Sequence, residues 1–363
     1  MSKAAELANL IGNINAGGGG VNKNAIINGA MNVAQRGTSS TGLGASSGYF
    51  VCDRWRFSKG GDASAGRFTM TQDSSAPEGF ANSMKLDCTT ADTSIAAGEF
   101  LLIGQRIEGQ NMQTFAKGTS SAKPFAVSFY VKGNASATYV CELVDQDNTR
   151  QISKTFNVTT DWTRIELSFP ADTTGTLDDD NAKSFELSIW LHAGSTYNSG
   201  TLNSSSWASL TDANRAVGIS SFFDSTDRTF FITGVQLEVG QNPTEFESEP
   251  FGVTFDKCER YLQVFAQDNA NAHVASGYYH STTSLRCHMP FRQKMRAVPT
   301  GSIVNVGDFF VQDGGATAAP SAIATANNND TSMLTVTTSS RTAGNGGALL
   351  SDESSSIRMD AEL

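Results

Sequence analysis

Bulky apolar residues alternate with polar ones along several segments in the first two thirds of the chain. Because the side chains of a β-strand point alternately to opposite faces, apolar residues spaced two apart share one face. Four segments follow this pattern, and their predicted core faces are Phe125, Val127, Phe129 and Val131; Ile165, Leu167 and Phe169; Phe185, Leu187, Ile189 and Leu191; and Phe231, Val235, Leu237 and Val239. Each segment is therefore predicted to be a half-buried strand.

Turn-forming clusters rich in Gly, Asn, Asp and Pro separate the strand-like segments, at residues 133–136, 145–148, 170–180 and 240–243. Short strands divided by such turns, with no helical segments between them, are typical of a β-sandwich or jelly roll. The sequence therefore predicts an all-β fold, with a jelly-roll sandwich over residues 21–250.

Helical spacing is found near both ends of the chain. Residues 2–14 place Ala4, Leu7, Ile11 and Ile14 in one stripe, which is too short to be stable alone and has to pack on copies of itself, on the sandwich or on a partner. Four glycines end at residue 20 and predict a flexible hinge. We therefore expect residues 1–20 to anchor or oligomerise the chain.

Residues 251–363 are predicted to form a second, small β-rich domain with one helix. The helix is indicated by Phe255, Cys258, Leu262 and Phe265, which follow helical spacing. Strand-like segments come after it, at residues 273–281, 284–291, 302–312, 332–340 and 356–363.

The composition narrows the classes of partner and the cellular compartment. A net charge of -10 disfavours binding to nucleic acid or to anionic membranes. No segment reaches the roughly 18 apolar residues of a membrane span, and the first residues lack the features of a signal peptide. The five cysteines show no CxxC spacing, which predicts buried thiols in a reducing compartment.

The sequence assembles no catalytic constellation. The four histidines, His192, His273, His280 and His288, have neither the HExxH spacing of a metalloprotease nor a GxSxG nucleophile motif beside them. Acidic pairs such as Asp178 and Asp180 are too common to indicate glycoside hydrolysis without geometry. We therefore predict a protein that is not an enzyme, and we assign no catalytic residue, metal ligand or cofactor.

Ligand binding is the better-supported chemistry. If Phe185, Leu187, Ile189 and Leu191 face the core, then Trp190 and His192 face the opposite side of the sheet. A tryptophan in that position suits a stacked sugar ring, a subunit interface or packing beneath the long loop 193–215. That loop carries Tyr197 and Trp207. The candidate ligand-binding residues are therefore Trp190, His192, Tyr197 and Trp207.

Three segments resemble tail-fibre and other virion proteins of tailed bacteriophages. The first is NAIINGAMNVAQRGTSS followed by YFVCDRWRF, at residues 24–40 and 49–57. The second is FFITGVQLEVGQNPTEFE, at residues 230–247. The third is KCERYLQVF with MPFRQKMRAVPT and the final MDAEL, at residues 257–265, 289–300 and 359–363.

The first and second segments are also similar to family 4/9-type carbohydrate-binding modules, which are jelly rolls that often carry a structural calcium. This chain has Thr233, Gly234 and Val235 where such modules usually have aspartates, so the similarity assigns no calcium ligands. The loop at residues 177–181 offers oxygen ligands for a cation, but a solvated turn is the preferred interpretation.

The resemblance implies a structural virion component, assembled in the host cytoplasm, that acts as a tail-fibre or receptor-binding subunit contacting the host surface. Subunits of this kind are typically homotrimers. The implied partners are further copies of the chain, other virion proteins that bind the N-terminal helix, and a host surface glycan. The alternatives are a head-decoration or tail-adaptor protein without sugar binding and a glycan depolymerase.

Overall fold

The structure is a computed structural model that describes residue 3 and residues 23–61, 64–265, 272–352 and 355–363. The chain forms two compact units: the first is Met1–Thr254 with Leu363, and the second is Phe255–Glu362. The predicted helical stripe of Ala4, Leu7, Ile11 and Ile14 and the glycine hinge lie outside the described residues. Among the residues described, no helix is long and apolar enough to cross a membrane.

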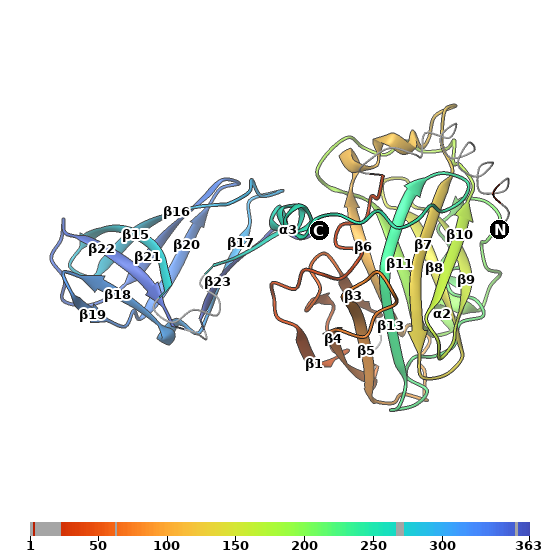
Figure 1. Cartoon of the computed structure of the whole chain (residues 1–363), viewed down its shortest axis with the longest axis horizontal. Coiled ribbons are helices and arrows are strands. Elements are labelled where there is room, and N and C mark those ends of the chain that lie inside the picture. Colours follow the sequence, from red (N-terminus) through yellow and green to blue (C-terminus); the bar gives the residue numbers. More distant parts are fainter. Residues whose placement is uncertain (1–2, 4–22, 62–63, 266–271, 353–354) are drawn as a thin grey trace. The chain divides into compact units, whose positions relative to one another are not determined.

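The described part of the first unit is a sandwich of two antiparallel sheets (Figure 1). In spatial order, the six-stranded sheet contains β1 (Ser39–Leu43), β4 (Arg67–Asp73), β5 (Ser83–Thr90), β13 (Thr229–Val239), β7 (Phe125–Gly133) and β10 (Thr163–Phe169). The seven-stranded sheet contains β12 (Ala208–Ser209), β9 (Arg150–Val158), β8 (Ala137–Asp145), β11 (Lys183–Ala193), β6 (Phe100–Glu108), β3 (Arg56–Lys59) and β2 (Gly48–Tyr49). The prediction of an all-β jelly-roll sandwich is confirmed.

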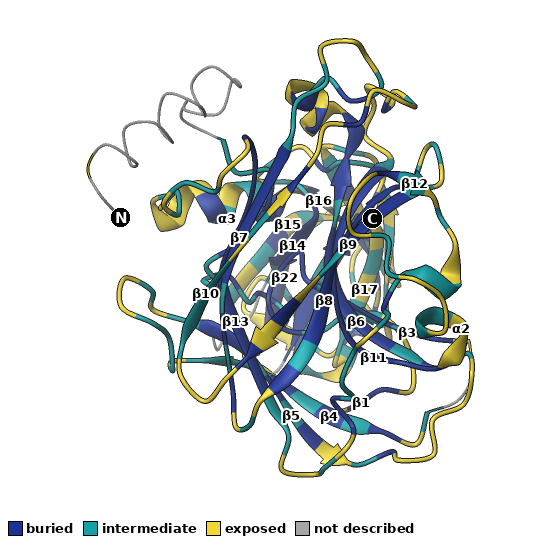
Figure 2. Cartoon of the chain, turned by 90° about the vertical axis from the view of Figure 1, so that its right-hand side faces the viewer, coloured by how far each residue is buried: buried dark blue, intermediate teal, exposed yellow. Residues whose placement is uncertain are grey.

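The main core lies between these two sheets and contains the faces that the alternation predicted for β7, β10 and β11. The predicted core residues of β7 and β11 are fully buried, and Figure 2 shows both strands largely in dark blue. Ile165 and Leu167 of β10 are only partly buried against the same core, because β10 is an edge strand. Period-two burial therefore accounts for this core.

Strand β13 departs from its predicted pattern at Phe231. This side chain is outside the main core and packs edge-on against Trp162, with 6.0 Å between the ring centroids. The register with β7 shifts between Thr233 and Gln236, where Gly234 has a φ of 63°. Such a bulge moves the residues beyond it to the opposite face. The core residues of the strand are therefore Phe230, Ile232, Val235, Leu237 and Val239.

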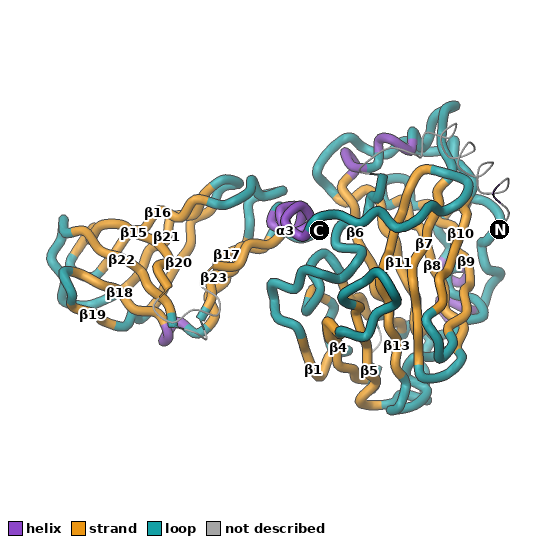
Figure 3. The backbone as a smooth tube through the Cα atoms, in the orientation of Figure 1, coloured by secondary structure: helices purple, strands orange, loops and turns teal. Residues whose placement is uncertain are grey.

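Short helical turns connect the strands of the first unit, as Figure 3 shows in purple. They are η1 (Gly109–Asn111), η2 (Gln113–Phe115), α2 (Ser195–Asn198) and η3 (Asp212–Asn214). Helix α2 and turn η3 belong to the long segment between β11 and β13, which covers part of the outer face of the seven-stranded sheet.

The described part of the second unit contains two antiparallel sheets, preceded by α3 (Phe251–Glu259). The three-stranded sheet contains β14 (Leu262–Phe265), β23 (Ser356–Asp360) and β17 (Thr300–Val304). The seven-stranded sheet contains β19 (Ala316–Ala318), β18 (Phe309–Asp313), β22 (Gly346–Ser351), β15 (Ala272–Ser281), β16 (Ser284–Pro290), β21 (Thr331–Thr337) and β20 (Ala322–Asn327), with the turn η4 (Val306–Asp308) before β18.

The helix predicted from Phe255, Cys258, Leu262 and Phe265 is wrong in its second half. Helix α3 ends at Glu259, and Leu262 and Phe265 lie in strand β14, paired with Asp360 and Ile357 of β23. Leu262 and Val264 also lie two residues apart on either side of the polar Gln263, so this short segment fits a strand as well as a helix. The backbone hydrogen bonds offered by β23 decide between the two.

Candidate functional site

The opening motif at residues 24–29 runs beside strand β13. Asn24 accepts a hydrogen bond from the backbone N–H of Leu237 and donates one to the backbone oxygen of Val235, at 3.0 and 3.1 Å. The backbone N–H of Ala25 donates to the oxygen of Leu237 at 2.8 Å. A Cβ at Gly29 would lie 2.1 Å from the oxygen of Val235, so only glycine fits there. The Asn and Gly of this motif therefore have a structural role.

Asn28, at the end of the same motif, connects it to the Asp-Arg-Trp motif. Its side-chain amide donates to the backbone oxygen of Asp53 at 3.0 Å, and its own backbone oxygen accepts from Nε1 of Trp55 at 3.1 Å. Asp53 in turn accepts from the backbone and the side chain of Gln35 at 2.9 and 2.6 Å. These four residues are buried, so this network is also structural.

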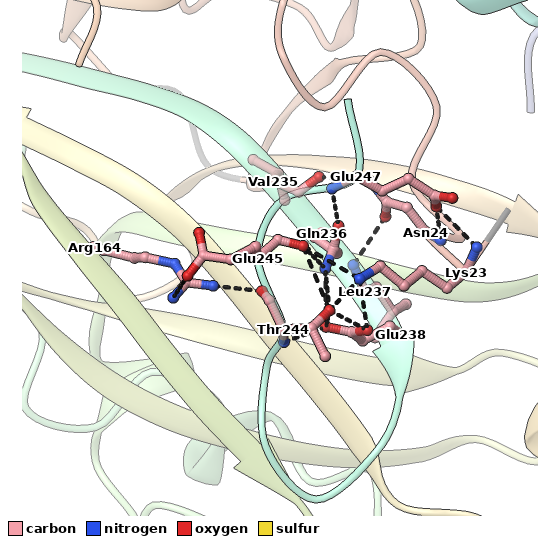
Figure 4. A network of polar contacts seen from close by, with 10 residues as sticks. All are labelled: Lys23, Asn24, Arg164, Val235, Gln236, Leu237, Glu238, Thr244, Glu245 and Glu247. Carbon is pink, nitrogen blue, oxygen red and sulfur yellow. Dashed lines mark hydrogen bonds and ion pairs between the residues drawn. The ribbon is translucent and has the colours of Figure 1, made fainter. Parts of the chain in front are cut away.

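The closing motif holds residues 244–247 against the polar face of β13 (Figure 4). Glu238 accepts hydrogen bonds from the backbone and hydroxyl of Thr244 at 2.6 and 2.9 Å. Gln236 accepts from the backbone N–H of Glu247 at 2.8 Å. Nζ of Lys23 lies 3.8 Å from the Glu238 carboxylate. Gln236 and Glu238 are fully buried, and their hydrogen bonds hold the segment after β13 in place.

Trp190 lies on the outer face of the seven-stranded sheet, as its position in the alternation predicted, but it is not exposed. Its exposed fraction is 0%. The ring packs against Phe100 and Tyr197 at 5.3 and 5.4 Å, and Nε1 donates to Glu142 at 2.8 Å. Of the three alternatives for this tryptophan, packing beneath the 193–215 loop is the one found in the structure.

Arg215 holds this loop against the outer face of the seven-stranded sheet. Its guanidinium lies 4.8 Å from the centre of the Trp190 ring and donates to both oxygens of Glu142, at 2.9 Å each. Burial is the largest single influence and lowers the pKa of Arg215, but the carboxylates of Glu142 and Asp212 together raise it above its usual value. We call Trp190, Glu142 and Arg215 the covered cluster. It is a neutralised ion pair stacked on an aromatic ring.

His192 and Trp207 are also buried by contacts within the chain. His192 lies 2.8 Å from the Ser221 hydroxyl and 3.4 Å from Glu99, and burial lowers its pKa more than Glu99 raises it. Trp207 is in the main core and donates to the backbone oxygen of Pro170 at 2.9 Å. The four predicted ligand residues therefore do not form one site. Trp190, His192 and Trp207 are buried and Tyr197 is partly buried against Trp190, so we base no binding proposal on them.

A buried lysine side chain lies beside the turn at residues 170–181. The side chain of Lys117 is fully buried and is ion-paired with Asp145 and, at 3.1 Å, with Asp172. The backbone oxygens of Thr174 and Gly175 also accept from its ammonium group at 3.0 Å each. No group of three metal-ligating side chains is found in the part of the chain that the structure describes. The ion pair with Asp172 and the hydrogen bonds to Thr174 and Gly175 show that the Lys117 ammonium group holds this turn.

A second cluster on the outer face of the seven-stranded sheet places partly exposed cations around a buried carboxylate. It consists of Arg56 on β3, Arg106 on β6 and Lys183 on β11 around Glu186 on β11, and we call it the basic patch. Arg106 pairs with Glu186 across the two strands, with 3.6 Å between Nε and the carboxylate. Their side chains are 23% and 12% exposed. The patch therefore brings cations from three strands together at the surface.

Neutral hydrogen-bonding groups complete the basic patch. Gln146 accepts from Nζ of Lys183 at 2.9 Å and donates to Glu186 at 3.2 Å. The hydroxyl of Ser188 lies 3.2 Å from the same carboxylate. Tyr49, on β2, is the cross-strand partner of Arg56. An amide, two hydroxyls and a carboxylate thus lie beside the cations.

The positive charges of the basic patch repel one another. Burial and then the charge of Arg106 lower the pKa of Arg56. The same two causes, in the same order, lower the pKa of Lys183. Glu186 acts in the opposite direction in both cases but does not cancel the effect. The patch therefore places three cations beside the carboxylate of Glu186, with Asp147 as a further counter-charge near Lys183.

An acceptor oxygen is already bound at the edge of the basic patch. The backbone oxygen of Leu363, which belongs to the first unit, accepts from Nη1 of Arg106 at 2.7 Å and from the Tyr49 hydroxyl at 2.8 Å. These two donors are therefore directed at one point on the surface.

The alternation of apolar and polar residues could have predicted part of this patch. Arg56 lies between the core residues Trp55 and Phe57, and Glu186 lies between Phe185 and Leu187, so each was expected on an outer face. Their convergence depends on the order and register of β3, β6 and β11, which alternation does not reveal.

No protein-family model matches the chain, and no curated protein matches its sequence. Among solved structures, a family 4 carbohydrate-binding module is similar, with a TM-score of 0.29 and 13% identity over 52% of this chain and 87% of the module. A family 61 module in complex with β-1,4-galactotriose is also similar, with a TM-score of 0.28 and 10% identity over 51% of this chain and 88% of the module.

A family 11 module from Clostridium thermocellum, in complex with a β-1,3-1,4-mixed-linked tetrasaccharide, has a TM-score of 0.27 and 13% identity over 56% of this chain and 96% of the module. Likenesses with such low scores carry no inference about function. What the site can do therefore has to be argued from the chain's own residues.

Proposed function

We propose that this chain is a structural, non-enzymatic subunit of a tailed-phage virion, of the tail-fibre or receptor-binding type, and that its first unit binds carbohydrate on the host surface. The observation that carries the proposal is that the segments resembling phage virion proteins, distant along the chain, meet and hydrogen-bond within each unit. Contact between these segments in the folded chain supports treating their resemblance as one feature of each unit.

In the first unit, the opening motif bonds both to the Asp-Arg-Trp motif and to the closing strand, through Asn28 and Asn24 respectively. In the second unit, the backbone N–H of Arg296 donates to the oxygen of Arg260 at 2.8 Å, and that of Ala361 donates to the oxygen of Tyr261 at 2.7 Å. All three pieces of the third resembling segment thereby contact one another.

The carbohydrate-binding part of the proposal rests on the basic patch. Sugars are recognised by a few convergent polar groups on a rigid scaffold, and this patch offers Gln146, Glu186 and the Tyr49 hydroxyl on neighbouring strands and their connections. Trimer formation and attachment to the particle through residues 1–20 complete the proposal, because avidity across three copies compensates for a weak single site.

A head-decoration or tail-adaptor role without sugar binding is the second candidate. It is favoured by the burial of Trp190 and Trp207, since neither tryptophan presents a stacking face to a sugar. The two candidates differ in where the chain lies on the particle and in whether it binds glycans.

Immunogold labelling of intact phage particles with antibodies against the full chain tests the location. We expect gold at the distal end of the tail. Gold on the head would favour the second candidate, and particles without gold would overturn the virion assignment. Binding of the full chain to a glycan array tests the carbohydrate part separately, and an array without signal would remove it.

A further inference from the structure

We propose that the second unit carries a separate binding surface for an acidic glycan, on the outer face of its seven-stranded sheet. A sugar ring stacks on Tyr278, and a carboxylate of the glycan pairs with Arg286. This inference does not rest on the basic patch, which lies in the first unit. It rests on the side chains that the register of this sheet leaves open and without partners.

Alternation along the strands of this sheet separates a buried face from an open one. Tyr279 on β15, Cys287 on β16 and Leu334 on β21 belong to the core of the second unit. Their neighbours in the chain therefore point to the other side. There, Tyr278 and Met333 are 50% and 40% exposed, so no described segment of the second unit covers them.

The register of the strands gathers an aromatic ring, a guanidinium and two imidazoles on the open side. Tyr278 is the cross-strand partner of Gly346 in one direction and of Arg286 in the other. The ring of His280 lies 6.4 Å from that of Tyr278. We call the following residues the tyrosine face: Tyr278 and His280 on β15, Arg286 and His288 on β16, Met333 on β21 and Gly346 on β22.

The space beside the Tyr278 ring is open. Gly346 has no side chain, and a Cβ built there would meet only the backbone oxygen of Gly277, at 4.0 Å. Among the described residues, His280 is the only one whose ring contacts Tyr278. A half-exposed aromatic ring beside such a space offers a flat apolar surface and a polar hydroxyl. One side of a sugar ring can therefore stack there.

Arg286 adds a positive charge that no side chain of this face neutralises. In the part of the chain that the structure describes, its guanidinium forms no hydrogen bond and no ion pair. Strands β15, β16, β20, β21 and β22 contain no aspartate or glutamate. A guanidinium presents its donors in a planar fork that matches a carboxylate. An acidic group of a bound glycan therefore supplies the counter-charge.

Acidic residues at the borders of the sheet do not supply it. The connections at the Tyr278 end of the sheet contain no acidic residue and one arginine, Arg341. Asp313, at the end of β18, has the parity of the core residues of that strand and so points to the buried side. Asp330 lies at the opposite end of the sheet and is 4.0 Å from Nζ of Lys294.

A glycan fits this face better than a protein or a nucleic acid. The core of a protein interface is apolar, whereas Arg286 and His288 of β16 lie between Tyr278 and Met333. Imidazole groups can donate or accept hydrogen bonds with sugar hydroxyls. The net charge of -10 on the whole chain disfavours a nucleic acid.

The test uses the full chain on an array of uronate- and sialate-bearing glycans, printed beside the same glycans after reduction of their carboxyl groups to alcohols. We expect binding to at least one acidic glycan and about tenfold weaker binding to its reduced form, as for loss of a charged hydrogen bond. Arg286→Gln should lower affinity for the acidic glycan by a similar factor and leave affinity for the reduced form unchanged.

Gly346→Val tests the open space without removing a contact of the fold. The φ of Gly346 lies outside the left-handed region and a Cβ has room there, so the variant should fold, as thermal unfolding will check. Its side chain fills the space beside Tyr278, and affinity for the acidic glycan should fall about tenfold. The matched control is Gly307→Val, in turn η4, where a Cβ has nothing within 4 Å; it should bind like the unmodified chain.

The outcomes separate this surface from the basic patch. Unchanged binding in Gly346→Val would overturn the tyrosine face, and a loss in Arg106→Gln alone would assign the glycan to the basic patch. Losses in Gly346→Val and Arg286→Gln, with Arg106→Gln unchanged, would support the tyrosine face even if the basic patch binds nothing. Equal binding of acidic and reduced glycans would overturn the acidic ligand. Tighter binding to a single-stranded DNA oligonucleotide would overturn the glycan, and binding to no glycan would overturn both proposals.

Discussion

The covered cluster and the basic patch lie on the same outer face of one sheet and are built from similar residues, yet their charge balance differs. In the covered cluster, Arg215 is paired with the carboxylates of Glu142 and Asp212 and stacks on Trp190. In the basic patch, three partly exposed cations lie around Glu186, and Arg106 is ion-paired with it. A balanced charge pair beneath a loop stabilises the fold, whereas unbalanced charge at the surface is available to a ligand.

The largest loss of stability is expected for Glu142→Ala, in the covered cluster. Removing this carboxylate leaves the buried Trp190 N–H without its acceptor and leaves the partly buried Arg215 guanidinium with only Asp212, at 3.3 Å. The free energy of unfolding should fall by roughly 3–5 kcal/mol, as for other broken buried pairs. Urea denaturation measures this loss, with Glu166→Ala as a surface control that should cost less than about 1 kcal/mol. A small loss in Glu142→Ala would mean that the loop does not depend on the pair.

Arg106→Gln is the corresponding change in the basic patch. Its free energy of unfolding should change by less than about 1 kcal/mol, because its ion partner Glu186 keeps the hydrogen bonds from Gln146 and Ser188. Urea denaturation of the variant beside the unmodified chain checks this. A loss as large as that of Glu142→Ala would make the basic patch a structural element like the covered cluster.

Lys183→Met should give the smallest change in the free energy of unfolding, and the size of this change should depend on pH. The folded pKa of Lys183 lies below its ordinary value of 10.5, so between the two values the folded chain binds fewer protons than the unfolded chain. The contribution of Lys183 to stability therefore rises as pH increases through that window. The variant should equal or slightly exceed the unmodified chain in stability at pH 7, and this advantage should shrink by pH 10.

Denaturation midpoints of both chains at the two pH values provide the measurement. Lys183→Met being clearly less stable at pH 7 would contradict the inferred repulsion between the cations of the patch. Lys154→Met, on strand β9 of the same sheet, serves as the matched lysine control.

Several features of the fold were predictable because they depend on local periodicity. The core faces of β7 and β11 follow directly from their alternation. Phe231 was wrongly predicted to face the core because the bulge at Gly234 adds a residue to the strand. The period of apolar residues does not predict where a bulge occurs. Leu262 was placed in a helix because a short apolar pattern fits both periods, and only pairing with β23 separates them.

The candidate site was less predictable than the fold. Alternation placed Trp190 on the correct face, but its exposure depended on whether the segment after β11 folds over it. Arg56, Arg106 and Lys183 are far apart in the sequence and have no shared motif. They meet only because β3, β6 and β11 are neighbours in the sheet.

The sequence by itself determined which side of each regular strand faces the core, because side-chain direction along a strand alternates residue by residue. Only the tertiary structure decided which of the outward side chains are covered and which cations lie together. Those outcomes depend on strand order, register and loop closure, which are set by contacts between residues distant in the chain.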